Sequence, residues 1–297
     1  MTDRTSLQRA ATSFNEKMVD PLRQMLIARK LFAKTTTLED GKFEMDYDTV
    51  TEMGEAIISY DIPDNTTKRD DIAVADASLK LAVISKGWKI PYSKWRAYLS
   101  EGKDLSTTGM TSAMQVCALL EEKLLLQSWK PDGSNARING LYASAGNNYS
   151  TSKDFGTYGN AKDAVAGVLS MMADDDVPTA SINWNYSLNP TQYYELEASE
   201  STSGIAEMEK VLRMLNPAQD MPPGQIIMSP DIAAGTGLVS PVDPAGLYIE
   251  FVKGKDMNNV LGTDSKLGEI SPVYGTTYEV VGLWVKHANA IGVTSAI

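Results

Sequence analysis

The sequence predicts an α+β fold, and three features of the 297-residue chain lead to it. One long apolar helix is predicted over about 106–130, helix and strand patterns follow each other over 151–244, and strand patterns dominate 245–297. Helices and strands that gather in separate stretches of a chain are typical of α+β proteins. The composition, 43% hydrophobic and 22% charged, is that of a globular protein with a sizeable core.

Residues 1–35 are predicted to form an N-terminal arm and a short helix. Apolar residues recur at a spacing near 3.6 over 5–34, and Asp20-Pro21 interrupts them, because proline suits the first turn of a new helix. The apolar positions are Leu7, Phe14, Met18, Leu22, Met25, Leu26 and Leu31. This segment has little core of its own, so we expect another surface to cover it.

An exposed two-stranded β-ribbon is predicted within 36–75. The stretch "KFEMDYDTV" alternates polar and apolar residues, and turn signals stand at Asp40-Gly41 and Pro63-Asp64-Asn65. Its apolar content is too low for a core, so such a ribbon must lie on something else. A solvated loop is the alternative that the sequence leaves open.

Residues 76–150 are assigned, with 245–297, to one peripheral domain. The stretch "LKLAVISKGWKIPYSKWRAYL" predicts a strand that Pro91 ends and a short helix that begins at Ser93. Three aromatic residues follow at near-helical spacing, and we interpret them as a packing seam and not as a ligand cage. They are Tyr92, Trp95 and Tyr98.

The long helix is predicted to begin at a Thr111 or Ser112 cap and to run to about Trp129. Its apolar residues cover most of the circumference, which predicts burial between two layers. One stripe comprises Met110, Met114, Cys117, Leu120 or Glu121, Leu124 and Ser128; a second comprises Val116, Leu119, Lys123 and Leu126.

Two adjacent carboxylates, Glu121 and Glu122, raise the question of a buried acid pair. No histidine lies at the spacing of a di-iron site, so a metal centre of the ferritin type is poorly supported. We therefore expect a charged helix edge, at which Lys123 and Lys130 neutralise the two carboxylates.

The remaining reactive side chains predict no catalytic centre. The single cysteine, Cys117, excludes an intrachain disulfide and is expected to be a buried thiol. The single histidine, His287, stands in "LWVKHANAIGV" and is expected to be an ordinary strand residue, so most enzyme chemistries lack their usual base. We expect no cofactor and no metal.

The net charge of −11 disfavours tight nucleic-acid recognition, which needs clustered lysine and arginine. The N-terminus lacks the apolar core of a signal peptide, and no stretch approaches the roughly 20 apolar residues of a membrane span. We expect a soluble protein that is made in the cytoplasm. A nucleic acid that the protein merely surrounds stays compatible with this charge.

The loop 131–160 is rich in Gly, Asn and Ser but matches neither GxGxxG nor a Walker pattern.

From Asn160 a capped amphipathic helix runs to about Asp174, and "SLNPTQYYELE" predicts a strand, a turn and a helix start. The stretch "SGIAEMEKVLRMLN" predicts another helix, and "GQIIMSP" a short buried strand. These elements form the predicted axial domain, 151–244.

This order of elements resembles the major capsid proteins of tailed phages and archaeal viruses, whose Hong Kong-type fold is shared with encapsulin shells. The likeness covers nearly the whole chain: an arm, a ribbon at 36–75, a spine helix at 106–130, "INGLYA" after the spine, "SLNPTQYYELE" in the axial domain and "IIMSPDI" at its second strand. The order and these short motifs carry the resemblance together.

The resemblance implies a major capsid protein without enzymatic activity, which assembles as pentamers and hexamers into an icosahedral shell around a viral genome. It implies a place in the virion, synthesis in the host cytoplasm, and portal, scaffold or minor capsid proteins as further partners, with no membrane. Candidate inter-subunit contact residues are Lys42, Glu44, Asp46, Tyr47, Asp48, Glu52, Lys68, Arg69, Arg23 and Arg29.

Two alternatives stay open. An encapsulin-type nanocompartment has the same fold but encloses cargo enzymes instead of a genome. A small-molecule enzyme would use the loop 131–160 as its binding site and would be monomeric or a small oligomer.

Overall fold

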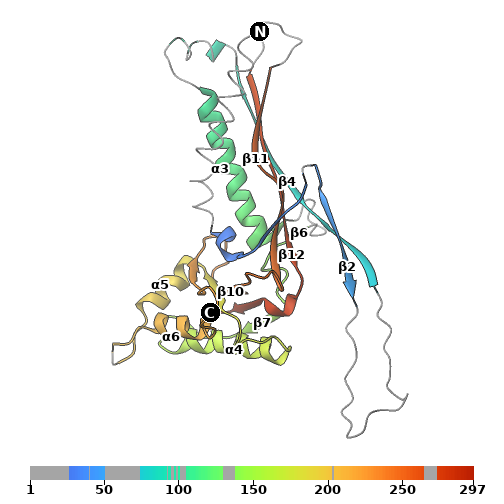
Figure 1. The fold of residues 1–297 in the computed structure, drawn as a ribbon. Coiled ribbons are helices and arrows are strands. Elements are labelled where there is room, and N and C mark those ends of the chain that lie inside the picture. The colour runs from blue at the N-terminus through green and yellow to red at the C-terminus, as the bar shows by residue number, and fades with distance from the viewer. Residues whose placement is uncertain are drawn as a thin grey trace, which may run out of the picture.

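The computed structural model describes residues 27–39, 41–50, 74–91, 93–94, 97, 100, 105–129, 138–202, 204–263 and 273–297. Its main elements are a four-stranded sheet with one long helix, a five-stranded sheet with shorter helices, and a projecting two-stranded ribbon (Figure 1). None of the helices in these ranges is both long and apolar enough to cross a membrane.

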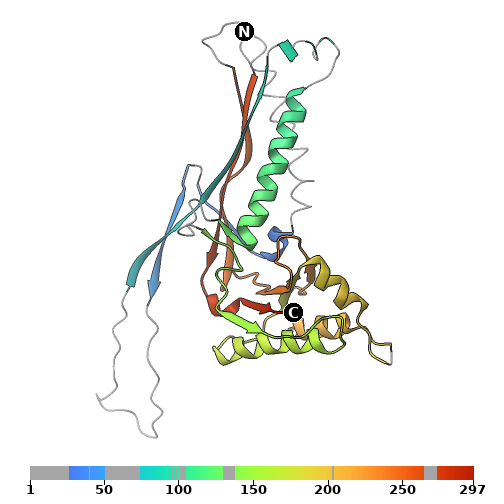
Figure 2. The same cartoon turned by 180° about the vertical axis from the view of Figure 1, so that it is seen from behind.

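A four-stranded sheet and the long helix form one half of the molecule. The sheet has the order β1 (Thr35–Thr37), β11 (Ile249–Thr263), β12 (Val273–Val285) and β4 (Ala82–Ile90). β11 and β12 pair as a long antiparallel hairpin, β4 is antiparallel to β12, and β1 is parallel to β11. The helix α3 (Leu105–Leu126) runs along β4 and β12, as both views show (Figure 1 and Figure 2).

The helix lies close to the sheet because glycines leave room for one indole ring. Trp88 of β4 stands opposite Gly275 of β12, and a β-carbon on Gly275 would overlap the ring. A β-carbon on Gly109 of α3 would lie 3.0 Å from Trp88 Cε3. Larger residues at either glycine would therefore push the helix away from the sheet.

A five-stranded sheet forms the other half. Its order is β7 (Asn147–Ser150), β13 (Gly292–Ser295), β10 (Thr236–Pro241), β8 (Trp184–Leu188) and β9 (Ile226–Met228). Its helices are α4 (Asn160–Asp174), α5 (Pro190–Ala198) and α6 (Glu207–Leu215). α4 packs against β7 and β13, and α6 packs against β8. β8 is buried along its whole length, which makes it the centre of this half.

Two large cores fill the described chain, and the first of them reaches into both halves. It joins α3 to the four-stranded sheet through Met114 and Phe251, and it also contains Val293 of β13 in the five-stranded sheet. The second surrounds Trp184 and gathers the apolar faces of α4 and α6. Tyr248 packs against both cores.

Short elements complete the described chain. They are the 3-10 helices η1 (Ala28–Leu31) and η3 (Ala288–Ala290), the pair β5 (Ser128–Trp129) and β6 (Ile138–Asn139), and the ribbon strands β2 (Glu44–Val50) and β3 (Val74–Lys80). β3 leads through Leu81 directly into β4, so the ribbon leaves the body from the edge of the four-stranded sheet.

Most predicted elements are present, including the ribbon base, the strand that Pro91 ends, the helix–strand order after 160 and the C-terminal strands. The Asn-Pro step is a true helix start, because the Asn189 side chain accepts a hydrogen bond from Thr191 N at 3.1 Å. Ser93, Lys94, Ala97 and Ser100 are helical as expected, whereas Tyr92, Trp95 and Tyr98 lie outside the described residues.

Within the described residues, three local predictions are wrong. α3 begins at Leu105, so Thr111 and Ser112 lie inside it and do not cap it. The helix expected up to residue 34 gives the short η1 turn, and the chain becomes extended at Phe32; the residues before 27 lie outside the described part. His287 follows β12 as an exposed residue beside Tyr248. The helix predicted from Asn160 is present as α4, but Gly159 holds its cap position and has no side chain to accept a hydrogen bond.

A carboxylate from α6 caps α4 instead. Glu207 is fully buried, and its two oxygens accept hydrogen bonds from Gly159 N and Lys162 N, each at 2.9 Å. Ser199 Oγ donates a third, also at 2.9 Å. A buried carboxylate at a helix N-terminus satisfies free amide donors and interacts favourably with the helix dipole.

We predict that Glu207→Ala lowers the free energy of unfolding by about 2–3 kcal/mol, because buried N–H groups lose their acceptor. Glu209→Ala is the matched control, since Glu209 stands in the same first turn of α6 but is exposed. Urea unfolding of unassembled subunits measures both. Equal losses in the two variants would contradict the capping role.

Candidate assembly surface

The ribbon has one outward polar face and one face that turns to the body. β2 and β3 are antiparallel, with Glu44 opposite Lys80 and Val50 opposite Val74. Along β2 the residues Glu44, Asp46 and Asp48 are exposed, whereas Met45 and Tyr47 are half-buried. This alternation is the period of two that the sequence predicted. The ribbon extends away from both sheets, so its outward face is open (Figure 2).

Apolar contacts fix the root of the ribbon on the four-stranded sheet. Leu81 N donates a hydrogen bond to Phe43 O at 2.9 Å, which closes the base of the hairpin. The Tyr47 ring lies 4.9 Å, centroid to centroid, from the Trp284 ring of β12. A small cluster lies beneath these contacts and comprises Leu81, Val252 and Val280, with Leu38, Met45, Leu79 and Trp284 packed against it. The ribbon therefore has a firm root.

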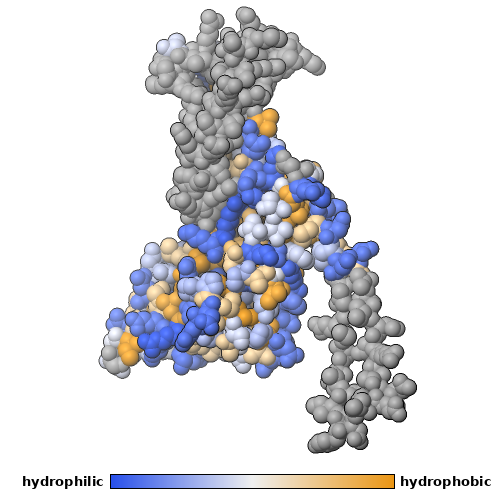
Figure 3. All heavy atoms as spheres, viewed as in Figure 1, coloured by the Kyte–Doolittle hydropathy of each residue, from blue (hydrophilic) through white to orange (hydrophobic). Residues whose placement is uncertain are grey.

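The outward face carries an excess of acidic side chains. Glu44 forms an ion pair with Lys80 at 3.4 Å, but both side chains are more than half exposed, so the pair contributes little stability. Asp48 stands directly opposite Asp76, and like charges opposed across two strands are unfavourable. The described part of the ribbon surface is correspondingly hydrophilic (Figure 3).

A buried carboxylate network reinforces the sheet next to the ribbon root. Glu250 of β11 accepts a hydrogen bond from Thr36 Oγ1 of β1 at 2.6 Å and one from Lys286 Nζ, beyond β12, at 2.8 Å. Burial raises the pKa of Glu250, but the Lys286 and Thr36 hydrogen bonds outweigh it, so the pKa is lowered overall. Lys286 also stands over the Trp284 ring, 4.1 Å from its centroid, which links the network to the ribbon root.

The end of the N-terminal arm is held on α3 by an ion pair. Arg29 donates to both oxygens of Glu121, from Nε at 2.5 Å and from a terminal nitrogen at 2.9 Å. The same guanidinium lies 3.5 Å from Glu279 of β12 and 5.0 Å from the centroid of the Phe251 ring of β11. Glu121 and Glu279 are both fully buried. One arginine thus joins the arm, the helix and the sheet.

Glu122 also faces the arm. Its side chain is buried, and the backbone N–H of Ile27 donates a hydrogen bond to it. Burial, followed by the nearby charge of Asp231, raises the pKa of Glu122. The expected charged edge with Lys123 and Lys130 is therefore wrong. Arg29 is the partner of Glu121, Lys123 is exposed, and Lys130 lies outside the described residues.

The apolar circumference of α3 is only partly covered. The first predicted stripe is buried from Met110 to Leu124, with Glu121 and not Leu120 as its member, whereas Ser128 is half-buried and lies beyond the end of α3. The second is wrong as a buried face, because Val116, Leu119 and Lys123 are exposed and only Leu126 is buried. Helix α3 thus has a sheet-facing side and an open side.

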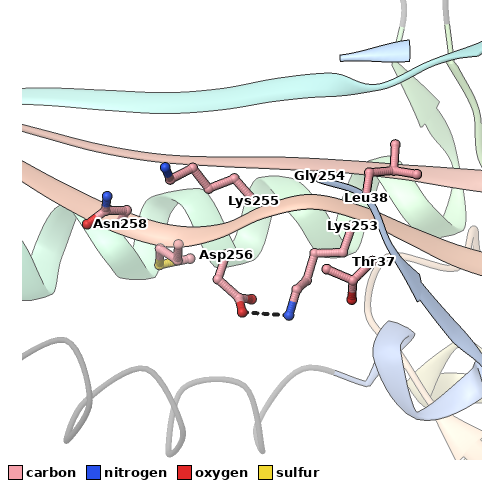
Figure 4. Close-up of a pocket in the computed structure, with 8 residues that line it drawn as sticks. Thr37, Leu38, Lys253, Gly254, Lys255, Asp256 and Asn258 are labelled. Carbon is pink, nitrogen blue, oxygen red and sulfur yellow. Dashed lines mark hydrogen bonds and ion pairs between the residues drawn. The ribbon is translucent and has the colours of Figure 1, made fainter. Parts of the chain in front are cut away.

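A shallow pocket lies where β1 ends beside a bulge in β11. The register shifts between Lys253 and Lys255 and again before Asn258, which bends the strand. Lys253 Nζ and Asp256 Oδ2 face each other at 2.5 Å across the pocket (Figure 4). Lys253 is therefore neutralised by Asp256, and the hollow follows from the bulge.

Glycines in the described part of the loop 131–160 serve close packing. A β-carbon on Gly140 would lie 2.6 Å from Leu124 O, and one on Gly146 would lie 2.5 Å from Asn289 Oδ1. Residues 131–137 lie outside the described part. The prediction of a buried thiol is confirmed, since Cys117 lies in the core, and its burial raises the pKa of the thiol to about 11.

The predicted contact residues fall into three groups. Lys42, Glu44, Asp46 and Asp48 are exposed around the ribbon, and Lys42 forms an ion pair with Glu39 at 3.0 Å. Tyr47 and Arg29 make the contacts within their own subunit described above, and their role between subunits stays a prediction. The others, Arg23, Glu52, Lys68 and Arg69, lie outside the described residues.

The sequence did not predict three residues of this surface. Trp284 and Glu250 lie at the ribbon root, and Glu279 belongs to the ion-pair cluster of Arg29 and Glu121, which we call the latch. All three stand in the C-terminal strands, far along the chain from their partners. One sequence signal could have identified the two glutamates as buried acids. Each stands among apolar strand residues, in "YIEFV" and in "YEVVG".

A family model described as "Encapsulating protein for peroxidase" matches residues 7–260. The fold is similar to a virus-like particle from Pyrococcus furiosus, with 14% identity, a TM-score of 0.64, and 95% of this chain and 98% of that chain covered. It is also similar to the capsid of the Myoviridae phage XM1, with 11% identity, a TM-score of 0.66 and 87% of each chain covered.

The capsid of a native GTA particle is similar too, with 13% identity, a TM-score of 0.62, and 90% of this chain and 88% of that chain covered. At these identities the likeness to solved structures establishes the fold. A search of curated proteins gives no match. The predicted capsid-like α+β fold is confirmed by these similarities.

We predict that Arg29→Ala lowers the free energy of unfolding by about 3–5 kcal/mol, because Glu121 is left buried without its partner. Lys30→Ala is the matched control, since Lys30 is exposed in the same turn. Urea unfolding measures both, and Glu121→Gln in the Arg29→Ala background should recover part of the loss. Equal effects at the two positions would contradict the latch.

Because the pKa of Glu250 is lowered in the folded state, we predict that the free energy of unfolding depends on pH. Its folded-state pKa is lowered, so its contribution is complete above the unfolded pKa of about 4.3 and is lost as pH falls through the folded value. The difference in unfolding free energy between the wild type and Glu250→Gln should therefore shrink as pH falls from 6 to 3. A difference that is constant over this range would contradict the assignment.

Proposed function

The chain belongs to the Linocin_M18 family of encapsulating proteins, and we propose that its copies tile, as pentamers and hexamers, a closed icosahedral shell around a viral genome. Shell formation itself follows from the family and from a fold shared with phage capsids. The enclosed genome and the arrangement in pentamers and hexamers are the parts that we propose.

The projecting ribbon carries the proposal. An isolated two-stranded ribbon is marginally stable in water, and in the described part of this one, 44–50 with 74–80, the apolar contacts with its own subunit lie at the root. A neighbouring subunit would supply the missing contacts. Each contact would be modest, but repetition around closed symmetry axes multiplies their effect.

The proposed contact surface consists of the exposed residues around the ribbon, Lys42, Glu44, Asp46 and Asp48, together with the Tyr47 edge. Within this proposal the chain is divided into an arm at 1–35, a ribbon at 36–75, a peripheral domain at 76–150 with 245–297, and an axial domain at 151–244. β13 pairs within the five-stranded sheet, so the last strand would cross from the peripheral to the axial domain.

Two observations support a genome as the content. The similar solved structures include capsids of a phage and of a GTA particle. The net charge of −11 also suits a wall that surrounds nucleic acid without gripping it, because strong attraction would oppose packaging. The protein would then be made in a host cytoplasm and reside in the virion, with portal, scaffold or minor capsid proteins as further partners.

A cargo compartment is the second candidate, and the family description favours it. That description names an encapsulating protein for peroxidase, so the shell of this chain would hold a protein instead of a genome. In both cases we propose a structural protein without catalytic activity. The carboxylates that first suggested catalysis serve the latch between the arm and α3.

The content of the particles separates the two candidates. We expect size-exclusion chromatography and negative-stain electron microscopy to show closed particles, and nuclease-treated particles from the native source to retain nucleic acid. Particles that contain only a second protein would establish the cargo compartment. A monomer or dimer under every salt and pH condition would overturn the proposal.

We predict that removing residues 44–80 abolishes closed shells but leaves a folded subunit. The Leu81 N to Phe43 O hydrogen bond shows that the two ends are adjacent, so a two-glycine linker can join them. Far-ultraviolet circular dichroism and electron microscopy measure the two effects. Shells of normal appearance would contradict the ribbon's role, and an unfolded chain would show that the ribbon belongs to the core.

A further inference from the structure

The open side of α3 presents an apolar stripe. Val116, Leu119 and Leu120 are 45%, 65% and 41% exposed, respectively, and Lys123 ends the stripe. Their spacing of three and four residues places them on one face of the helix, and at the edge of this face Leu120 also lines a pocket with residues 82–85 of β4. Aliphatic residues that gather on one exposed helix face indicate a surface that another segment covers.

The described chain begins at this same helix. Arg29 binds Glu121, and Ile27 N donates to Glu122, so residue 27 lies within about one turn of Leu119. The 26 residues before it therefore start from a point that is fixed beside the stripe. Val116 to Lys123 spans only about 10 Å along the helix axis, so a short part of the arm can follow it.

The sequence of the arm has the chemistry that this stripe requires. Its apolar residues recur at helical spacing, and those nearest to the fixed point are Leu22, Met25 and Leu26. Glu16 and Asp20 provide acidic groups that can face Lys123. A segment whose sequence offers little core of its own is thus joined, at residue 27, to the helix whose apolar stripe the described residues leave uncovered.

We propose that residues 7–26 dock on the stripe formed by Val116, Leu119 and Leu120 of their own subunit. The docked arm would complete the apolar environment of α3 and would continue the latch that Arg29 begins. An arm supplied by a second copy, or a different partner on the stripe, is a competing outcome that the following experiment distinguishes.

Engineered cysteines test the docking directly in the full chain. In a Cys117→Ala background, Leu119→Cys is combined in turn with Leu22→Cys, Met25→Cys and Leu26→Cys, and the unassembled subunit is oxidised mildly. We expect at least one pair to give an intrachain disulfide, seen as a fast-migrating monomer on a non-reducing gel. Tyr194→Cys on α5, 58% exposed, replaces Leu119→Cys in the matched control. Asp46→Cys with Ser78→Cys, which face each other across the ribbon, is the positive control.

Three results would overturn the proposal. Disulfide-linked dimers would show that the stripe receives the arm of another copy. Equal crosslinking of the arm to Leu119→Cys and to Tyr194→Cys would show that the arm has no preferred site. The absence of any arm disulfide, when the ribbon pair crosslinks, would show that the arm does not reach the stripe.

A second measurement tests the docking without a crosslink. Leu119→Asp should release the arm and speed tryptic cleavage at Lys17 and Arg23 roughly tenfold, because the apolar contact is lost. Tyr194→Asp, the matched control, should leave the cleavage rate unchanged. An unchanged rate in Leu119→Asp would also overturn the proposal. Neither experiment depends on shell formation, so each tests the docking separately from the proposed function.

Discussion

The buried ion pair between Arg29 and Glu121 is the interaction on which the arrangement of the subunit depends. Glu121 and Glu279 are both removed from water, and a buried carboxylate is tolerated only with a partner. Arg29 stands in the short η1 turn, so the cost of burying the carboxylates holds that turn against α3. The position of this turn thus follows from electrostatics, and the apolar contact of Phe32 with Phe251, 6.0 Å between ring centroids, adds to it.

The same principle operates at the ribbon. Glu250 is held by Thr36 and Lys286, Lys286 stands over Trp284, and Trp284 receives Tyr47 of the ribbon. Each buried charge is therefore shared between segments that are distant in sequence. These contacts fix the bases of the segments that extend from the subunit. A fixed base favours contacts between copies in a shell, because less conformational entropy is lost when the copies associate.

The order of elements could be predicted from the sequence, because it depends on local patterns: the alternation in "EMDYDTV", the Asn189-Pro190 helix start and the long apolar run of α3. The buried carboxylates could not. Whether Glu121 is an exposed edge or a buried anion depends on Arg29, 92 residues away, and periodicity carries no information on that partner. The Glu207 cap was missed for the same reason, since it comes from another helix, 48 residues after Gly159. The open side of α3 was mispredicted because its apolar residues suggested a second covering layer.

The strand orders of the two sheets bear on how the chain can fold. β1 pairs with β11, β4 with β12, and β7 with β13, so both sheets combine strands from residues 35–150 with strands from the last fifth of the chain. Neither sheet can be completed while the C-terminal strands are still on the ribosome. Pairings between distant segments also close slowly, because the loop entropy must be lost before contacts form. The newly made chain therefore passes through a period with unpaired strand edges, in which many identical copies at high concentration are at risk of aggregation.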